Sequence, residues 1–117
     1  MRILPAALVA ATIVAFGLPA QAAEKYTWDG YGSGSYSKCA IYGMHIEFTV
    51  ENGTATGWWQ QKDRVVREFS FPVAADGSFA GKVNIGPADM NVAGNVGASP
   101  EIKLRGYCNF GGPAKKQ

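Results

Sequence analysis

The sequence predicts a small all-β protein: a single antiparallel meander of about seven strands that forms a small barrel or a closed sandwich. Apolar and polar residues alternate at period two along most of the chain, and Gly, Pro, Asn and Asp interrupt the alternation at short intervals. A second observation is a pair of distant cysteines, Cys39 and Cys108. We expect one disulfide that joins the first strand to the last, because a domain of this size has a modest core.

The N-terminal segment has the features of a secretory signal peptide. Arg2 precedes an apolar run over residues 3–18, and the small-x-small site Ala20-Gln21-Ala22 predicts cleavage before Ala23. A membrane-spanning helix needs ~20 apolar residues, which is longer than this run. We therefore expect residues 1–22 to be removed, residues 23–117 to form a single periplasmic or secreted β domain, and no membrane insertion after cleavage.

Composition argues against several functional classes. The chain has 11 Lys and Arg against 9 Asp and Glu, and removal of Arg2 with the leader leaves the charge nearly balanced. This balance disfavours nucleic acid as a partner. Neither cysteine has a second Cys or a His at ligand spacing, so we expect no metal and no cofactor.

The first strand is expected over residues 28–36, although most residues between 30 and 35 are Gly or Ser. Its position just before Cys39 supports the assignment, because the disulfide would then fasten it to the last strand. The aromatic residues Tyr26, Trp28, Tyr31 and Tyr36 either fill the seam of a barrel or form a binding loop.

Residues 44–61 predict a hairpin with a defined register. Asn52-Gly53 suits a type I′ turn because both central positions need positive φ. A two-residue turn then pairs Val50 with Ala55 and Ile46 with Trp59 on the core face. Glu47 faces Trp58 and His45 faces Gln60 on the outer face, which makes Trp59 a core residue and leaves Trp58 on the solvent side.

A second hairpin is expected between residues 67–73 and 79–85. A three-residue loop, Ala75-Asp76-Gly77, keeps both apolar faces in agreement by pairing Phe71 with Gly81, Phe69 with Val83 and Val73 with Phe79. Gly77 supplies the left-handed residue that this loop requires.

The remaining chain continues the meander. A four-residue loop over 86–89 would pair Ile85 with Met90, Val83 with Val92 and Phe79 with Val96. The last strand is expected over 102–110, with Ile102, Leu104, Gly106, Cys108 and Phe110 toward the core. Residues 111–117 are expected to be a flexible tail, in which Lys115-Lys116 is solvated.

The predicted register brings four chemically useful side chains together on the outer face: His45, Glu47, Trp58 and Gln60. An exposed indole with polar neighbours could stack on a sugar and bind its hydroxyls, so these residues form a possible ligand-binding patch. The alternative is that Trp58 only covers its neighbours. His45 and Glu47 could share a proton, but no nucleophile or second convergent acid accompanies them, so we expect no catalytic residues and no enzyme.

A possible partner-binding loop follows the first hairpin. Lys62, Asp63 and Arg64 mix charges and are expected to be exposed, either as ordinary surface or as a protrusion that enters a cleft in a partner. A protein partner would meet such a loop, and substitutions at 61–64 or 86–89 would then abolish binding.

Three short stretches, at 28–31, 75–79 and 104–108, resemble those of small exported β-meander proteins of Gram-negative bacteria, a group largely of unknown function. The overall plan is also similar, more distantly, to periplasmic inhibitors of lysozyme and of proteases. Ser33-Gly34-Ser35-Tyr36 is one residue shorter than the Ser-Gly-x-x-Tyr element of those lysozyme inhibitors.

These observations favour an exported, non-enzymatic binding module, an inhibitor or an envelope-associated factor that engages an envelope or extracellular protein. Two alternatives remain open: a glycan-binding module that uses the Trp58 patch, and a structural envelope protein without a dedicated ligand.

Overall fold

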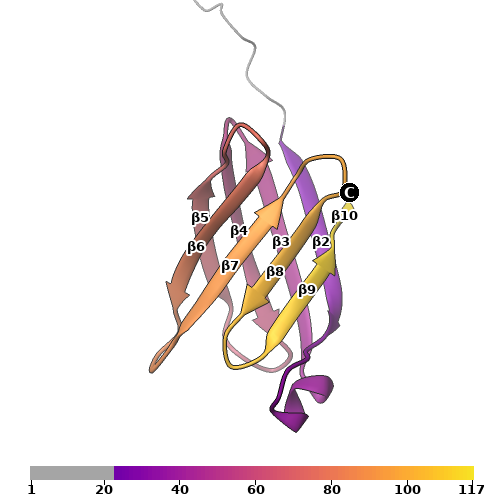
Figure 1. Cartoon of the computed structure of the whole chain (residues 1–117), viewed down its shortest axis with the longest axis vertical. Coiled ribbons are helices and arrows are strands. Elements are labelled where there is room, and N and C mark those ends of the chain that lie inside the picture. Colours follow the sequence, from indigo (N-terminus) through magenta and orange to yellow (C-terminus); the bar gives the residue numbers. More distant parts are fainter. Residues whose placement is uncertain (1–22) are drawn as a thin grey trace, which may run out of the picture.

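The computed structural model describes residues 23–117, which form a two-layer antiparallel β sandwich (Figure 1). The first sheet has the strand order β10-β2-β3-β4-β5. Its strands are β2 (Glu24–Tyr31), β3 (Gly43–Glu51), β4 (Thr54–Gln61), β5 (Arg67–Pro72) and the short β10 (Lys115–Lys116). The second sheet has the order β6-β7-β8-β9, with β6 (Ser78–Asn84), β7 (Asp89–Asn95), β8 (Glu101–Arg105) and β9 (Asn109–Pro113).

The expectation of an all-β fold is confirmed, and of the two predicted architectures the sandwich is the one that forms. The sheets do not close into a barrel, and the meander is divided between two sheets instead of running through a single one. The core lies between the layers, where alternate residues of both sheets meet. Its fully buried side chains include Phe48, Ile46, Met90, Ile102, Leu104 and Val92.

The hairpin of β3 and β4 has the predicted register at every pair. Val50 pairs with Ala55, Ile46 with Trp59 and Glu47 with Trp58. Asn52 and Gly53 both have positive φ, at 51° and 78°, as a type I′ turn requires. Trp59 is buried and Trp58 is half-buried on the outer face.

The predicted hairpin of β5 and β6 is wrong, because the two strands belong to different sheets. β5 pairs with β4 and β6 pairs with β7, and the chain crosses between the layers through a tight turn in which Gly77 N–H donates to Ala74 O. Phe71 does approach Gly81, but across the sandwich: a Cβ at Gly81 would overlap the Phe71 ring. Alternation records which face of a strand is buried, and that face is the same in both arrangements.

The β6–β7 hairpin forms with a register two residues away from the predicted one. Val83 pairs with Met90 and Phe79 with Gly94, because the loop occupies residues 85–88 and is closed by a bond from Ile85 N–H to Ala88 O. A shift of two residues keeps every side chain on its face. It also sets the Phe79 ring over Gly94, where any Cβ would collide with it.

The single last strand expected over 102–110 is also wrong, since a turn at 106–108 divides it into β8 and β9. Ile102, Leu104 and Phe110 still face the core. Residues 111–117 were expected to be a flexible tail. They instead include the end of β9, which pairs with β8, and the short strand β10, which pairs with β2.

The Cys39–Cys108 disulfide is confirmed, with a Cα–Cα distance of 5.6 Å. It does not join the first and last strands, because β2 ends at Tyr31 and Cys39 lies in a short 3₁₀ helix, η1 (Ser37–Ile41). Its partner lies in the β8–β9 turn. Backbone bonds in both directions between Ser33 and Asn109 add to the disulfide, so the two layers are fastened together at this corner.

The proposed signal peptide, residues 1–22, lies outside the described residues. Within residues 23–117 there is no helix of the length and apolar character needed to cross a membrane.

Candidate functional site

The four outer-face residues predicted from the register do lie together. His45 and Gln60 face each other, as do Glu47 and Trp58, and the rings of His45 and Trp58 are 5.1 Å apart. β3 and β4 position them because residues two apart on a strand project from the same face.

Two partners of this cluster, Asp29 and Lys25, were missed by sequence reasoning. His45 Nδ1 lies 2.6 Å from Asp29 Oδ1, and His45 Nε2 lies 3.2 Å from Glu47 Oε1. Lys25 Nζ lies 3.0 Å from Glu47 Oε2. Both residues come from β2, whose start was placed too late in the sequence; its alternating residues Lys25, Thr27 and Asp29 were the available signal.

The charges of this cluster satisfy one another. Burial disfavours the charged imidazolium, yet the hydrogen bonds and charges of Asp29 and Glu47 prevail and raise the pKa of His45. The hydrogen bond from Lys25 lowers the pKa of Glu47, burial opposes this effect, and His45 lowers the pKa further. The carboxylates and imidazole that a sugar would need are therefore already engaged.

Gln60 supports the loop that follows β4. Its Nε2 donates to Arg64 O at 2.9 Å, and the Arg64 N–H donates to Gln61 O. Asp63 adopts a left-handed φ of 65° at the tip. Lys62, Asp63 and Arg64 are all exposed on the protruding loop. The contacts divide the predicted ligand patch: Gln60 bonds to this loop, His45 and Glu47 bond to Asp29 and Lys25 of β2, and the Trp58 ring lies beside that of His45.

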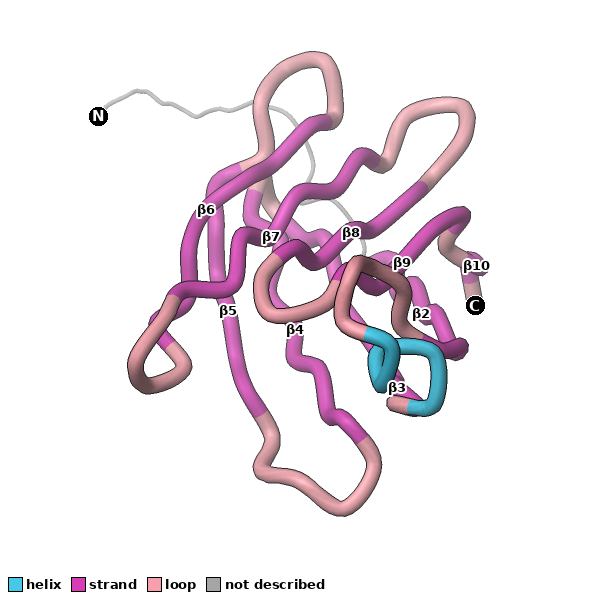
Figure 2. Tube along the Cα trace, turned by 60° about the horizontal axis from the view of Figure 1, so that its bottom comes forward, coloured by secondary structure: helices cyan, strands magenta, loops and turns pink. Residues whose placement is uncertain are grey.

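A larger feature was not predicted: one end of the sandwich carries every exposed large hydrophobic side chain found in residues 23–117. We call it the η1 end and define it as residues 31–43, 61–67, 85–89 and 105–109. In Figure 2 this end of the molecule faces the viewer, and η1 lies beside the loops and turns that connect the strands. Its exposed hydrophobic residues are Tyr31, Tyr36, Ile41, Val65, Val66 and Tyr107.

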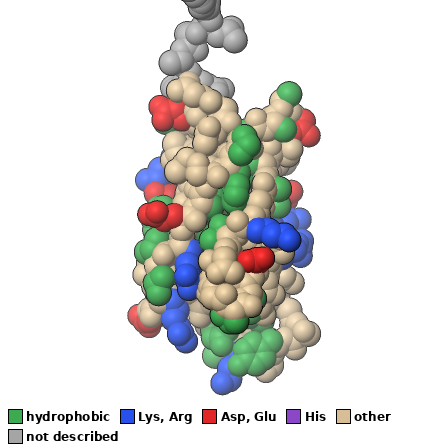
Figure 3. Space-filling model, turned by 90° about the vertical axis from the view of Figure 1, so that its left-hand side faces the viewer, with side chains coloured by type: hydrophobic (Ala, Val, Ile, Leu, Met, Phe, Trp, Pro, Cys, Tyr) green, Lys and Arg blue, Asp and Glu red, His purple; other side chains and the backbone are tan. Residues whose placement is uncertain are grey.

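Basic residues outnumber acidic residues at the η1 end. The residues that define this end include Lys38, Lys62, Arg64, Arg67 and Arg105, against Asp63 and Asp89. Figure 3 shows hydrophobic and basic side chains gathered at this lower end of the molecule.

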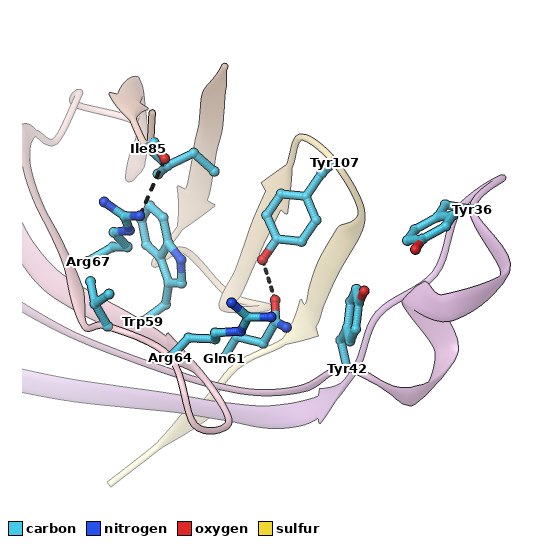
Figure 4. Close-up of a pocket in the computed structure, with 9 residues that line it drawn as sticks. Tyr36, Tyr42, Trp59, Gln61, Arg64, Arg67, Ile85 and Tyr107 are labelled. Atoms are coloured by element: carbon cyan, nitrogen blue, oxygen red, sulfur yellow. Dashed lines mark hydrogen bonds between the residues drawn. The ribbon is translucent and has the colours of Figure 1, made fainter. Parts of the chain in front are cut away.

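A pocket of about 340 Å³ opens between the two sheets at the η1 end (Figure 4). Trp59 and Arg67 lie on one side of it, the three tyrosines on the other, and Arg64 and Gln61 between them. Its lining residues are Tyr36, Tyr42, Trp59, Gln61, Arg64, Val65, Arg67, Ile85 and Tyr107.

Hydrogen bonds and ring contacts hold the walls of this pocket in place. Tyr107 donates its hydroxyl to Gln61 Oε1 across the gap between the sheets, and Arg67 Nη2 donates to Ile85 O at 3.3 Å. The Tyr42 and Tyr107 rings are 6.5 Å apart. Burial, with a smaller effect from Tyr42, raises the pKa of Tyr107, while the positive charges of Arg64 and Arg67 oppose this rise.

Sequence reasoning found Arg64, placed Gln61 in the segment that a partner would contact and gave a binding loop as one alternative for Tyr36, but it missed the other residues of the pocket. Tyr31 and Tyr36, for which a barrel seam was one expectation, are exposed instead. The turn at 106–108 exposes Tyr107, and no alternation pattern reveals that turn. The available signal was the number of tyrosines near the two cysteines.

No protein-family model matches this chain, and the comparisons with curated proteins and with solved structures found no match either. In the described part of the chain, no group of three or more His, Cys, Asp or Glu residues is arranged to hold a metal ion.

Proposed function

We propose that this chain is an exported, non-enzymatic binding module that engages a protein partner through the η1 end. The observation that carries the proposal is the concentration of exposed Tyr, Ile and Val side chains, bordered by Lys and Arg, at one end of the sandwich. Contiguous apolar surface with a polar border is typical of interaction sites.

The residue types suit a protein interface. Tyrosine and arginine are enriched among the residues that contribute most to binding, because they combine large contact area with directed polar groups. At the η1 end, Tyr36, Tyr107 and Arg64 are residues of these two types, and all three line the pocket. Small polar ligands would leave most of the exposed apolar surface uncovered.

The η1 end is also well braced. The disulfide attaches η1 to the β8–β9 turn, the Ser33–Asn109 backbone bonds attach the segment before η1 to the start of β9, and Gln60 supports the loop at 62–66. A surface that is ordered before binding loses less conformational entropy in the complex.

Export rests on the leader-like segment over residues 1–22, and the disulfide is compatible with an oxidising compartment such as the periplasm or the cell exterior. The architectural resemblance to envelope inhibitors agrees with a role in which one rigid end of the molecule binds to a partner protein.

Site-specific photocrosslinking in the producing cell tests this proposal. A benzoylphenylalanine is placed at position 41 or 65 on the η1 end, and at position 98 as an exposed control on the opposite end. We expect one discrete adduct from positions 41 and 65 and none from position 98. An identical adduct from position 98, or none from any position, would refute the assignment, and the latter result is the outcome expected of a structural protein without a ligand.

The glycan alternative depends on Trp58. It predicts that Trp58→Ala abolishes a fluorescence change caused by peptidoglycan fragments or oligosaccharides, while the crosslinks at the η1 end are absent. The protein-binding proposal predicts no fluorescence change with millimolar sugar, because His45 lies against the Trp58 ring and the nearby carboxylates are paired.

A further inference from the structure

The pocket at the η1 end has a charge that its own residues leave uncompensated. Its lining contains two arginines and no acidic residue. Neither Arg64 nor Arg67 forms a salt bridge with any residue of the described chain. Two guanidinium groups in one recess therefore favour the entry of an anion.

From this arrangement we infer that the pocket binds a carboxylate presented by the partner protein, so that an acidic residue inserts between the two sheets beside Arg64. The inference rests on the proposed function, because it names the group that the η1 end recognises. Planar guanidinium groups match carboxylates in a bidentate geometry that a lysine cannot reproduce.

The two arginines differ in freedom. Arg67 donates one hydrogen bond to Ile85 O, which holds its side chain in place without cancelling its charge. The Arg64 guanidinium has no hydrogen-bond partner among residues 23–117, although its backbone is held by Gln60 and Gln61. Arg64 is thus available for direct contact, whereas Arg67 supplies a fixed positive charge.

The apolar walls select the kind of anion. Trp59, Val65 and Ile85 line the pocket with hydrocarbon surface, which suits the methylene groups of an acidic side chain. Inorganic phosphate has no methylene groups and would leave these apolar walls in contact with water. The surrounding rings also exclude part of the solvent, which strengthens the charge interaction relative to an exposed surface pair.

The pocket volume is sufficient for one inserted side chain. At about 340 Å³ it is near the lower limit of typical ligand pockets, ~300 Å³, and too small for an extended polymer. Most of the partner's contact would therefore lie on the exposed rim, with a single acidic residue placed inside.

Side-chain NMR of the disulfide-bonded protein tests the inference with defined probes. The signals followed are the arginine Nε–H groups and the Trp59 indole N–H during titration with acetyl-Leu-Glu-Leu-amide. We expect saturable shifts at millimolar concentration, at least ~10-fold weaker binding of acetyl-Leu-Gln-Leu-amide, and weaker binding of sodium phosphate. Acetyl-Leu-Gly-Leu with a free C-terminus distinguishes a chain-terminal carboxylate from an acidic side chain.

Arg64→Gln and Arg67→Gln should each weaken the binding of the glutamyl peptide by ~10-fold or more. Arg105→Gln is the matched control, since Arg105 is an exposed arginine of the same end that does not line the pocket. Equal binding of the Glu and Gln peptides, tighter binding of phosphate, or unchanged binding by Arg64→Gln would overturn the inference.

The crosslinking experiment separates failure of this inference from failure of the proposed function. If the adduct from position 41 persists with full yield in both Arg64→Gln and Arg67→Gln, the η1 end binds a partner without using the carboxylate pocket. If the adduct is absent from the unmodified protein, the proposed function itself is wrong.

Discussion

The two ends of the sandwich are built in different ways. The η1 end exposes aromatic and branched side chains beside basic residues and has a pocket between the sheets. The opposite end, which we call the turn end, consists of residues 51–54, 72–78 and 95–101. The turn end has no exposed large hydrophobic side chain among its residues, and Asn, Asp, Gly, Ala and Ser dominate its turns.

The difference lies in what the side chains are used for. At the turn end they satisfy the local backbone: Asp76 Oδ1 accepts hydrogen bonds from the N–H and the hydroxyl of Ser78, and Asn95 Oδ1 accepts one from the Gly97 N–H. At the η1 end, the disulfide and backbone-to-backbone bonds perform much of this bracing. Many side chains there remain free to face a partner.

The largest expected effect comes from removing the disulfide. Replacing both Cys39 and Cys108 with Ala should lower the free energy of unfolding by ~4 kcal/mol, because the closed loop spans 69 residues. Chemical denaturation measures this loss. In hydrogen exchange, the Ser33 and Tyr42 amides should lose protection before the Val73 amide, which is bonded at the turn end. Equal loss of protection at both ends would contradict the distinct roles of the two ends.

A smaller effect is expected at the turn end from Gly77→Ala. The φ of Gly77 is 88°, and a Cβ there would lie 3.2 Å from Gly97 N. The substitution should cost ~1–2 kcal/mol in denaturant unfolding. Gly53→Ala is the control, because its φ is also positive and nothing lies within 4 Å of the added methyl. If Gly77→Ala lowers the free energy of unfolding by no more than Gly53→Ala does, the turn at 74–77 can adjust to the added methyl group.

The two ends should also respond to pH in opposite directions. The pKa of His45, beside the η1 end, is raised above 6.5, so its stabilising pairs are complete below pH 6.5 and are lost as pH rises through the folded-state pKa. The pKa of Asp76 is lowered below 3.8, chiefly by hydrogen bonds from Ser78, so its contribution is complete above pH 3.8 and is lost as pH falls.

Thermal unfolding across this pH range measures both responses. His45→Gln should flatten the profile on the side where His45 titrates, and Asp76→Asn should flatten it only in acid. If His45→Gln leaves the profile unchanged above pH 6.5, the pairing with Asp29 and Glu47 contributes nothing to folding.

The smallest effect on stability is expected at Ile41, whose side chain is 72% exposed. Ile41→Ser should change the free energy of unfolding by no more than ~0.5 kcal/mol. The same substitution should reduce the crosslink yield from position 65, because it removes apolar contact area. Ala98→Ser at the turn end should change neither quantity, and a reduced yield with Ala98→Ser would weaken the distinction between the ends.

The parts of the fold that were predictable depend on short, restrictive turns. Asn52-Gly53 allows one register, and every β3–β4 pair follows from it. The loop at 85–88 is longer and permits two registers with the same buried faces, which explains the displacement of Val83 from Val92 to Met90. The same ambiguity led to the wrong prediction that β5 pairs with β6, whereas β5 pairs with β4 and β6 pairs with β7.

The candidate site was partly predictable for a related reason. Lys62, Asp63 and Arg64 form one continuous loop, so their exposure could be inferred from local composition. The pocket instead combines the two tyrosines that flank η1, the ends of β4 and β5, the loop between these strands, the 85–88 loop and the 106–108 turn. Its members are far apart in sequence and have no shared local pattern.

The sequence was sufficient to establish the strand-rich fold class, the β3–β4 hairpin, the buried face of most strands and the cysteine pair. These features depend on side-chain alternation, local turn geometry and residue type. The division into two sheets, the position of the disulfide and the separation of an apolar, basic end from a polar end became clear only in the tertiary structure. They arise from contacts between distant segments, where packing across the layers selects among pairings that are equivalent along the chain.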